Sequence, residues 1–282
     1  AYLERDNTKA AEAALAYHTE NSPGVADAHY ALQLALCRAS VAFTKGNYSQ
    51  VVEAVQEPMR AGAHPQLQLD AMELAGDAYC RMREWSAAAN TFRSLLKKVD
   101  TDERRINAQL KLLRTFVARE QFPEAKELLA AVKQETTADA TPQLPLYELL
   151  LLVAQSRIDE AVAFFEKHKG NFASQDTPMA WTVLSQLGHK LVATGQTGAA
   201  PDVLKQAAVA ALTEEQRKNM LFLHFDVLLR LEQQSKAVAA FRELQERFSG
   251  DPAIAEAEIK LADFLRSTEQ YEAANKRYTA VM

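Results

Sequence analysis

The sequence is poor in glycine and proline, with nine of each among 282 residues. Both residues are costly inside helices, so their scarcity favours a chain built almost wholly of helices. Hydrophobic residues make up 48% of the chain and charged residues 24%. This composition supplies ample material for a core and excludes an intrinsically disordered chain.

Cysteine is also scarce. The two cysteines, Cys37 and Cys80, fall in predicted helices of different repeats. We therefore expect no disulfide between them, and we expect both thiols to be buried and to pack as small apolar side chains. They leave the redox compartment open.

The chain has no basic stripe of the kind that binds nucleic acid. Its net charge is −5 and its pI is about 5.8. The densest basic stretches, 97–98 and 104–105, lie among Asp100, Asp102 and Glu103, which cancel their field. A nucleic-acid partner is therefore not expected.

Long apolar runs are missing too. The longest, 144–154, contains Pro145 and Glu148 and is far shorter than the ~20 residues that cross a bilayer. We expect no membrane span. Residues 1–9 lack the apolar run of a signal peptide, so either no signal exists or it precedes this sequence.

Motifs that carry chemistry are absent as well. None of the six histidines lies three or four residues from another histidine or from a cysteine, as a zinc site would require. There is no phosphate loop, dinucleotide fingerprint or nucleophile elbow. Asp226, Asp263 and Glu73 could act as acid–base pairs, but isolated acids on helices are more often solvated or paired with Lys or Arg. We therefore expect no catalytic residue, no metal and no cofactor.

What the sequence does contain is a repeat. Small residues return at intervals of 36 to 40 residues, at Ala11, Val51, Ala88, Ala125, Ala161, Ala200, Ala237 and Ala274. A larger apolar residue follows each of them one helical turn later, at Leu15, Val55, Phe92, Leu129, Phe165, Leu204, Phe241 and Tyr278. A fixed period of this length indicates a stacked-repeat protein, in which each unit is too small to bury its own apolar face.

The stretch 69–102 is the clearest unit. Two apolar stripes with helical spacing are separated by Arg83 and Glu84, which predicts two short amphipathic helices joined by a tight turn. Gly76 and Ala88 are small where the two backbones of this hairpin approach each other.

The run Gly76-Asp77-Ala78-Tyr79, followed by Trp85, Ala88 and Phe92, resembles the tetratricopeptide repeat. The resemblance covers essentially the whole chain and implies an all-α fold, a right-handed α-solenoid of stacked antiparallel helical hairpins. Val51, Thr197 and Gln234 depart from the pattern, and we expect looser or rearranged packing there.

We expect a single solenoid over residues 1–282, as a fragment of a longer array. The predicted hairpins span 1–22 (partial), 28–62, 68–100, 103–135, 142–169, 178–211, 214–249 and 252–282. Helix starts are predicted at Thr141-Pro142, Thr177-Pro178 and Asp251-Pro252, where a capping side chain precedes a proline. Thr213 with Gln216 predicts a capping box.

The resemblance also implies a binding groove, lined by the first helix of each hairpin. Carried onto this sequence, the groove slots are Leu36 and Ser40, Glu73 and Asp77, Leu110 and Arg114, Leu146 and Leu150, Ser185 and His189, Phe222 and Asp226, and Ile259 and Asp263. The residues that we predict to bind a partner are Leu110, Arg114, Leu146, Leu150, Ser185, His189, Phe222 and Asp226. A mixed groove of this kind suits a peptide or helix with apolar anchors.

The helix predicted over 145–153 is apolar almost all round. Two interpretations stay open: either repeat packing buries it completely, or Leu146 and Leu150 form an exposed apolar patch for a partner.

These features favour a non-enzymatic scaffold that holds a peptide or protein segment in its groove. The segment 241–274 loosely resembles repeats of bacterial cell-envelope assembly proteins, which suggests an envelope or secretion setting and leaves the periplasm, the envelope or the cytoplasm as compartments. The alternative function is a regulatory or substrate-recruiting segment of a larger enzyme. The sequence does not define the oligomeric state, and a self-associating array is a third option.

Overall fold

A computed structural model describes residues 28–60, 65–99, 101–136, 141–168 and 177–281, together with residues 13, 16, 17, 170 and 172. Within these ranges the chain is all-α and has no strand, as the sequence predicted. The chain divides into two compact units, residues 1–136 and 137–282, and each is described by itself. The partial hairpin predicted over 1–22 lies almost wholly outside the described residues, and the single solenoid over 1–282 stays a prediction.

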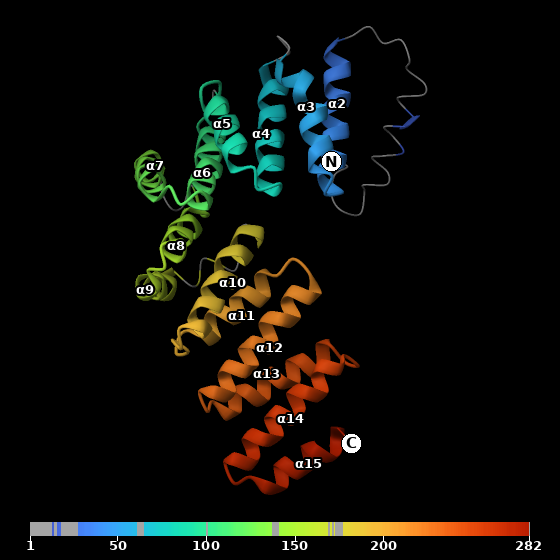
Figure 1. Cartoon of the computed structure of the whole chain (residues 1–282), viewed down its shortest axis with the longest axis vertical. Helices are drawn as coiled ribbons and strands as arrows, with labels where there is room; N and C mark the ends of the chain where they lie inside the picture. The colour runs from blue at the N-terminus through green and yellow to red at the C-terminus, as the bar shows by residue number, and fades with distance from the viewer. Residues whose placement is uncertain are drawn as a thin grey trace. The chain divides into compact units, whose positions relative to one another are not determined.

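Unit 1 contains three described helical hairpins (Figure 1). In chain order its helices are α2 (Ala28–Thr44) and α3 (Tyr48–Arg60), α4 (Pro65–Arg81) and α5 (Trp85–Leu96), and α6 (Asp102–Ala118) and α7 (Phe122–Glu135). Within each hairpin the two helices pack against each other, and the second helix also packs against the first helix of the next hairpin. The first helices α2 and α4 are in contact as well.

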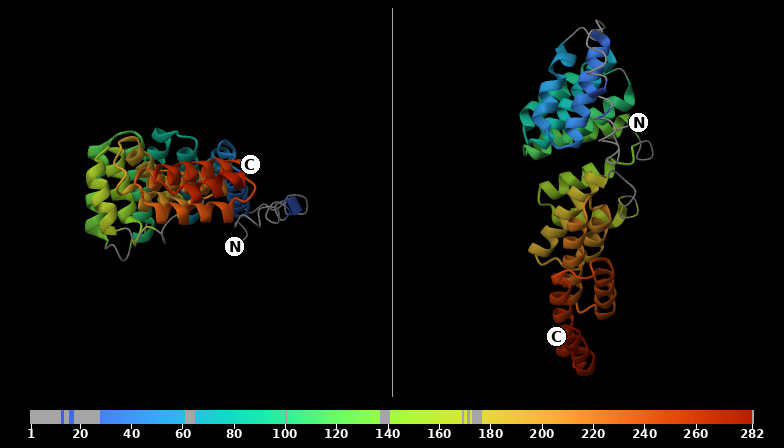
Figure 2. Two further views of the ribbon diagram at one scale, coloured as in Figure 1. Left: turned by 90° about the horizontal axis from the view of Figure 1, so that it is seen from below. Right: turned by 90° about the vertical axis from the view of Figure 1, so that its right-hand side faces the viewer.

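Unit 2 contains four described hairpins (Figure 2). Its helices are α8 (Leu144–Ala154) and α9 (Ile158–His168), α10 (Thr177–Ala193) and α11 (Ala200–Ala210), α12 (Glu214–Arg230) and α13 (Gln234–Arg247), and α14 (Pro252–Ser267) and α15 (Tyr271–Val281). First helices again meet within the unit, since α8 contacts α10 and α12 contacts α14.

The repeated small residues form the interior of both units. Every described member of the series, namely Val51, Ala88, Ala125, Ala161, Ala200, Ala237 and Ala274, is at most 1% exposed. The partner one turn later is also buried in most hairpins; Phe92, Phe165 and Leu204 are fully buried. Small residues let the helix axes approach, and the large neighbour fills the space that remains.

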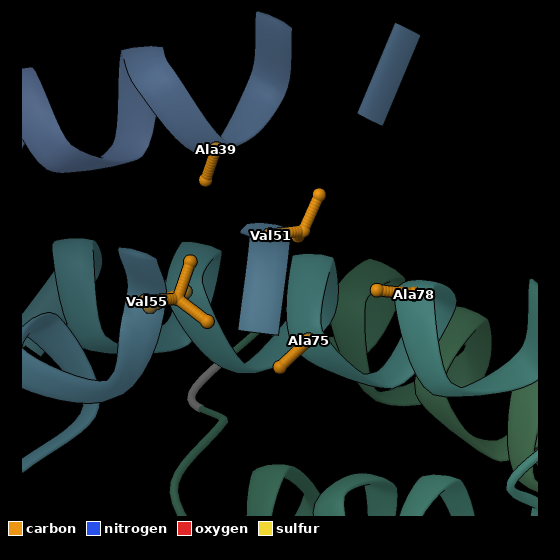
Figure 3. Packing of buried hydrophobic residues seen from close by; sticks show 6 residues of the cluster. Ala39, Val51, Val55, Ala75 and Ala78 are labelled. Carbon is orange, nitrogen blue, oxygen red and sulfur yellow. The ribbon is translucent and has the colours of Figure 1, made fainter. Parts of the chain in front are cut away.

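Figure 3 shows this packing at the start of unit 1, where Ala39 of α2, Val51 and Val55 of α3, and Ala75 and Ala78 of α4 share one interior. All five of these residues are at most 1% exposed. Because each helix contributes only a narrow stripe, no hairpin in this region buries its apolar face without its neighbour.

Tight turns join the helices within most hairpins. Three residues link the helices, and the middle one has a positive φ, as at Gly46 (80°), Arg83 (62°) and Glu120 (58°). The third residue donates a backbone hydrogen bond to the carbonyl five residues earlier, for example Gln121 N to Phe116 O at 2.9 Å. This pattern satisfies carbonyls at the end of the first helix.

The hairpin α10–α11 differs. The predicted slot at Thr197 is not helical, and α11 begins only at Ala200, with Pro201 in its first turn. The departure of Thr197 from the repeat pattern therefore marks a longer connection.

Three of the predicted helix starts are confirmed. Helix α10 begins at Thr177, at the predicted Thr177-Pro178. The side chain of Thr213 accepts a hydrogen bond from Gln216 N at 3.2 Å, and Gln216 Oε1 accepts from Thr213 N at 3.3 Å, which is a capping box. Asp251 caps α14 through Ala253 N at 2.9 Å. The start predicted at Thr141-Pro142 is wrong, because residues 142–143 form a turn and α8 begins at Leu144.

Candidate partner-binding face

A cavity of about 390 Å³ opens between the first two described hairpins of unit 1. We call it the α2–α4 cavity. It is lined by Leu36, Cys37 and Ser40 of α2 and by Asp70, Glu73, Leu74 and Asp77 of α4. The lining residues of each helix are adjacent or lie three or four positions apart, so one face of each helix forms one wall. Four of the seven, Leu36, Ser40, Glu73 and Asp77, are predicted groove slots.

Three carboxylates lie in the α4 wall, and α6 supplies their cations. Arg104 Nη2 is 2.5 Å from Asp70 Oδ1, and Lys111 Nζ is 2.7 Å from Asp77 Oδ2. Arg104 Nη1 lies 3.8 Å from Glu73 Oε1, too far for a hydrogen bond. Neither cation lines the cavity. The wall therefore presents three acids, of which only two are closely paired.

Glu73 lies between the two paired acids and is the least well solvated. Its side chain is 30% exposed. Burial raises the pKa of the Glu73 carboxyl above its usual value, while the nearby charges of Arg104 and Lys111 lower it. The charged form of Glu73 is thus under-compensated, and an added cation in the cavity would stabilise it.

Both cysteines are free, as expected. The prediction that both are buried is wrong for Cys37, which is exposed and lines the α2–α4 cavity. Cys80 is partly buried, and burial raises the pKa of its thiol to about 11. At neutral pH the Cys80 thiol therefore stays protonated and reacts slowly, whereas Cys37 is exposed to a thiol reagent.

The structure buries half of the residues that we predicted to bind a partner. Leu110 is 1% exposed, Leu146 0%, Leu150 6% and Ser185 9%. These four side chains pack inside their units and are not accessible to a partner in this structure. Their assignment to the groove was based on slot position alone, which says nothing about what covers the slot.

Burial also decides between the two interpretations of the apolar helix. In α8 all residues from Leu144 to Val153 except Glu148 and Leu152 are buried. A helix that is apolar all round is expected to lie inside a core. The exposed patch at Leu146 and Leu150 is therefore not present, and the packing interpretation holds.

The other four predicted residues remain accessible. Arg114 of α6 and Phe222 of α12 are partly exposed, and His189 of α10 is exposed. Asp226 of α12 has 28% of its side chain exposed and lies 3.3 Å from Lys260 Nζ of α14. Asp226 thus forms the cross-hairpin ion pair expected of an isolated surface acid.

The first helices of unit 2 repeat a feature of unit 1. Asp226–Lys260 and Asp77–Lys111 occupy the same slots and are each separated by 34 residues. In unit 2 the slot before Asp226 is the partly exposed Phe222, where unit 1 has Glu73, although Lys260 also pairs with Glu256 at 3.2 Å. The two units therefore present different chemistry on equivalent helix faces.

Residues that the sequence analysis did not select complete the α2–α4 cavity. Cys37 follows the slot Leu36, Leu74 follows Glu73, and Asp70 lies one turn before Glu73. Helical periodicity places these positions beside the named slots, so a wider stripe would have included them.

Within the described part of the chain, no group of three or more His, Cys, Asp or Glu residues could hold a metal ion. Among the described helices, none is both long enough and apolar enough to cross a membrane.

Comparison with known proteins identifies the fold. No family model matches the sequence, and no curated protein does. Among solved structures, apo RapI is 14% identical and aligns over 99% of this chain and 83% of its own, with a TM-score of 0.59. A tetratricopeptide repeat protein from Parabacteroides merdae is 12% identical over 91% of this chain and 93% of its own, with a TM-score of 0.57. NprR in complex with its cognate peptide NprX is 12% identical and aligns over 99% of this chain and 95% of its own, with a TM-score of 0.50. The chain therefore has the stacked-hairpin fold of tetratricopeptide-type repeat proteins.

Proposed function

We propose that this chain is a non-enzymatic scaffold that binds a peptide or an extended protein segment on the first helices of its hairpins. The observation that carries the proposal is the α2–α4 cavity, which opens on the slots Leu36, Ser40, Glu73 and Asp77. Its volume, about 390 Å³, lies within the range of ligand pockets.

The accessible slots outside the cavity support the same function. Arg114 in unit 1, and His189, Phe222 and Asp226 in unit 2, offer charged, polar and aromatic groups on first helices. Exposed aromatic and arginine side chains are typical of residues that dominate binding energy. The similarity of the fold to that of NprR, whose structure contains a cognate peptide, agrees with a peptide as the ligand class. The envelope or secretion setting stays a prediction.

A selection from a random peptide library displayed on phage, with the complete chain as bait, tests the proposal. We expect enriched peptides, and we expect hydrogen exchange to slow on first helices such as α4 and α12 when a synthetic copy of an enriched peptide binds. Arg114→Ala and Phe222→Ala should weaken binding with the fold intact. Absence of any enriched peptide, or protection confined to second helices such as α3 and α13, would contradict the proposal.

A further inference from the structure

We propose that the α2–α4 cavity accepts a cationic side chain of the bound peptide, with arginine preferred over lysine. This inference rests on the proposed function and specifies the ligand chemistry at one of its sites.

The α2–α4 cavity is acidic. The cavity lining holds Asp70, Glu73 and Asp77 and no basic residue. The two cations of α6 engage one oxygen each on Asp70 and Asp77 at hydrogen-bond distance. The second oxygen of each of these carboxylates, and both oxygens of Glu73, have no hydrogen bond within the described ranges. The wall therefore keeps acceptors for a donor that enters from the cavity.

The three carboxylates lie on one face of α4. Asp70, Glu73 and Asp77 succeed one another at spacings of three and four residues along α4, and side chains at these spacings are neighbours on a helix, with about 5–6 Å between their Cβ atoms. A guanidinium group carries five N–H donors in a planar fork and can bridge two such carboxylates, whereas an ammonium group is a compact point charge. This difference favours arginine.

Part of the cavity lining is apolar. Leu36 of α2 and Leu74 of α4 face the same cavity as the carboxylates. Arginine and lysine cover apolar surface with their aliphatic stems while their charged heads reach polar groups. An anionic ligand has no such fit, because the lining offers only the Ser40 hydroxyl and the Cys37 thiol as side-chain donors.

The test uses an enriched peptide from the phage selection and its copy with arginine replaced by citrulline, which keeps the shape and removes the charge. We expect citrulline to weaken binding about tenfold or more, as loss of a charge-assisted hydrogen bond does. Glu73→Gln in the protein should weaken binding of the arginine peptide by a similar factor and should hardly affect the citrulline peptide. Glu53→Gln, which changes an exposed carboxylate on the second helix α3, is the matched control and should leave both affinities unchanged.

A second measurement uses the protein without any substitution. Cys37 lines the cavity, so the arginine peptide bound to the unmodified protein should slow the reaction of Cys37 with a thiol reagent, and the citrulline peptide at equal concentration should protect less. Circular dichroism and the thermal midpoint establish that Glu73→Gln is folded.

The outcomes separate this inference from the proposed function. Enriched peptides that lack basic residues, or that bind first helices with less than a twofold effect of citrulline and of Glu73→Gln, would overturn the cationic site and leave peptide binding standing. Unchanged Cys37 reactivity with the arginine peptide bound would overturn it too. Failure of the library to yield any binder would overturn both.

Discussion

Gly76 on α4 lies against the ring of Phe92 on α5. A Cβ atom added at Gly76 would come within 2.6 Å of Phe92 Cζ, and Phe92 is 0% exposed. Real Cβ contacts are not this short, and a ring that is fully buried has little room to move. The absence of a side chain at Gly76 therefore sets the distance between the two helices of this hairpin, as the sequence analysis expected.

We predict that Gly76→Ala lowers the free energy of unfolding by about 1 kcal/mol, because the overpacking penalty of about 1–3 kcal/mol exceeds the gain of up to about 1 kcal/mol in helix propensity. Urea denaturation measures the change. Gly198→Ala is the control, since nothing lies within 4 Å of its added Cβ atom. A Gly76→Ala protein as stable as the parent would show that Phe92 can shift.

His224 on α12 is a buried, neutral imidazole. It is 8% exposed, and its Nδ1 atom has no hydrogen-bond partner among the described residues. Burial lowers the pKa of His224 from 6.5 to about 4. The positive charges of Lys205 on α11 and Lys236 on α13 also lower this pKa, whereas the negative charge of Asp202 raises it. The unfolded chain therefore binds a proton at this side chain between pH 6.5 and 4, where the folded chain does not.

Because the folded pKa of His224 lies below the unfolded one, its contribution to stability is full above about pH 6.5 and is lost as the pH falls toward 4. We predict that lowering the pH from 7.5 to 5.0 reduces the free energy of unfolding by about 2 kcal/mol through this group, given ~1.4 kcal/mol per pKa unit. Urea titrations of the parent and of His224→Leu at both pH values measure the contribution of His224 to this loss of stability. The substitution should remove it, and His189→Gln, at an exposed site, should not. An equal pH dependence in the parent and His224→Leu would refute the assignment.

At the level of helices, the three-residue turns within hairpins share one backbone conformation. In the three-residue turns the middle residue has a positive φ at Gly46 and at five non-glycine positions, Arg83, Glu120, Ser156, Glu232 and Glu269. For a residue with a Cβ atom this conformation costs roughly 1–2 kcal/mol. The repeat period imposes the turn geometry even where the sequence supplies a poorly suited residue.

Glu120→Gly should therefore stabilise the protein by about 0.5–1 kcal/mol, after the greater entropy of glycine in the unfolded chain is subtracted. Glu127→Gly, the same substitution at an exposed position inside α7, should instead destabilise it by about 1 kcal/mol. Chemical denaturation measures the free energy of unfolding of both variants and of the parent. If the turn is strained, the change relative to the parent has opposite signs in the two variants. Destabilisation by both would mean that glycine gains nothing at residue 120.

Helix starts show which local signals suffice. Thr213 with Gln216 and Asp251 before Pro252 were predictable because the capping bonds lie within three residues of sequence. Thr141-Pro142 is the same dipeptide as Thr177-Pro178, where α10 begins, yet α8 begins only at Leu144, whose backbone N donates to Thr141 O at 3.0 Å. Nothing within those few residues distinguishes a cap from a preceding turn.

For the molecule as a whole, the repeat was predictable and the accessible surface was not. The spacing of residues such as Ala88 and Phe92 predicts the hairpin. A small residue and a large residue one turn later recur in the same order in each repeat, and both residues contribute to the packing between helices. The exposure of Leu146 and Leu150 depends instead on the elements that pack around α8. The slots Glu73 and Asp77 were identified, but the cavity beside them exists only because the side chains of α2 and α4 leave space, and slot position does not encode that.

Within each unit the described helices make their extensive contacts with near neighbours in the chain. The extensive helix contacts join an element to the next or to the next but one, such as α4 with α5, and α12 with α13 and α14. Stability in such an array is roughly a sum of repeat and nearest-neighbour terms. Damage to one repeat should therefore stay local.

Phe92 and Phe241 allow a matched test of this locality. They occupy the same slot in α5 and α13; Phe92 is 0% exposed, and Phe241 is 1% exposed and packs against the ring of Phe225 at 6.1 Å. Truncation of either to alanine should cost about 3–5 kcal/mol. We predict that Phe241→Ala speeds native-state hydrogen exchange in α12–α15 and leaves α4 and α5 unchanged, whereas Phe92→Ala does the reverse, because the two residues belong to different compact units. Mass spectrometry of exchanged peptides measures both. Faster exchange along the whole chain in either variant would show instead that the repeats unfold as one cooperative body.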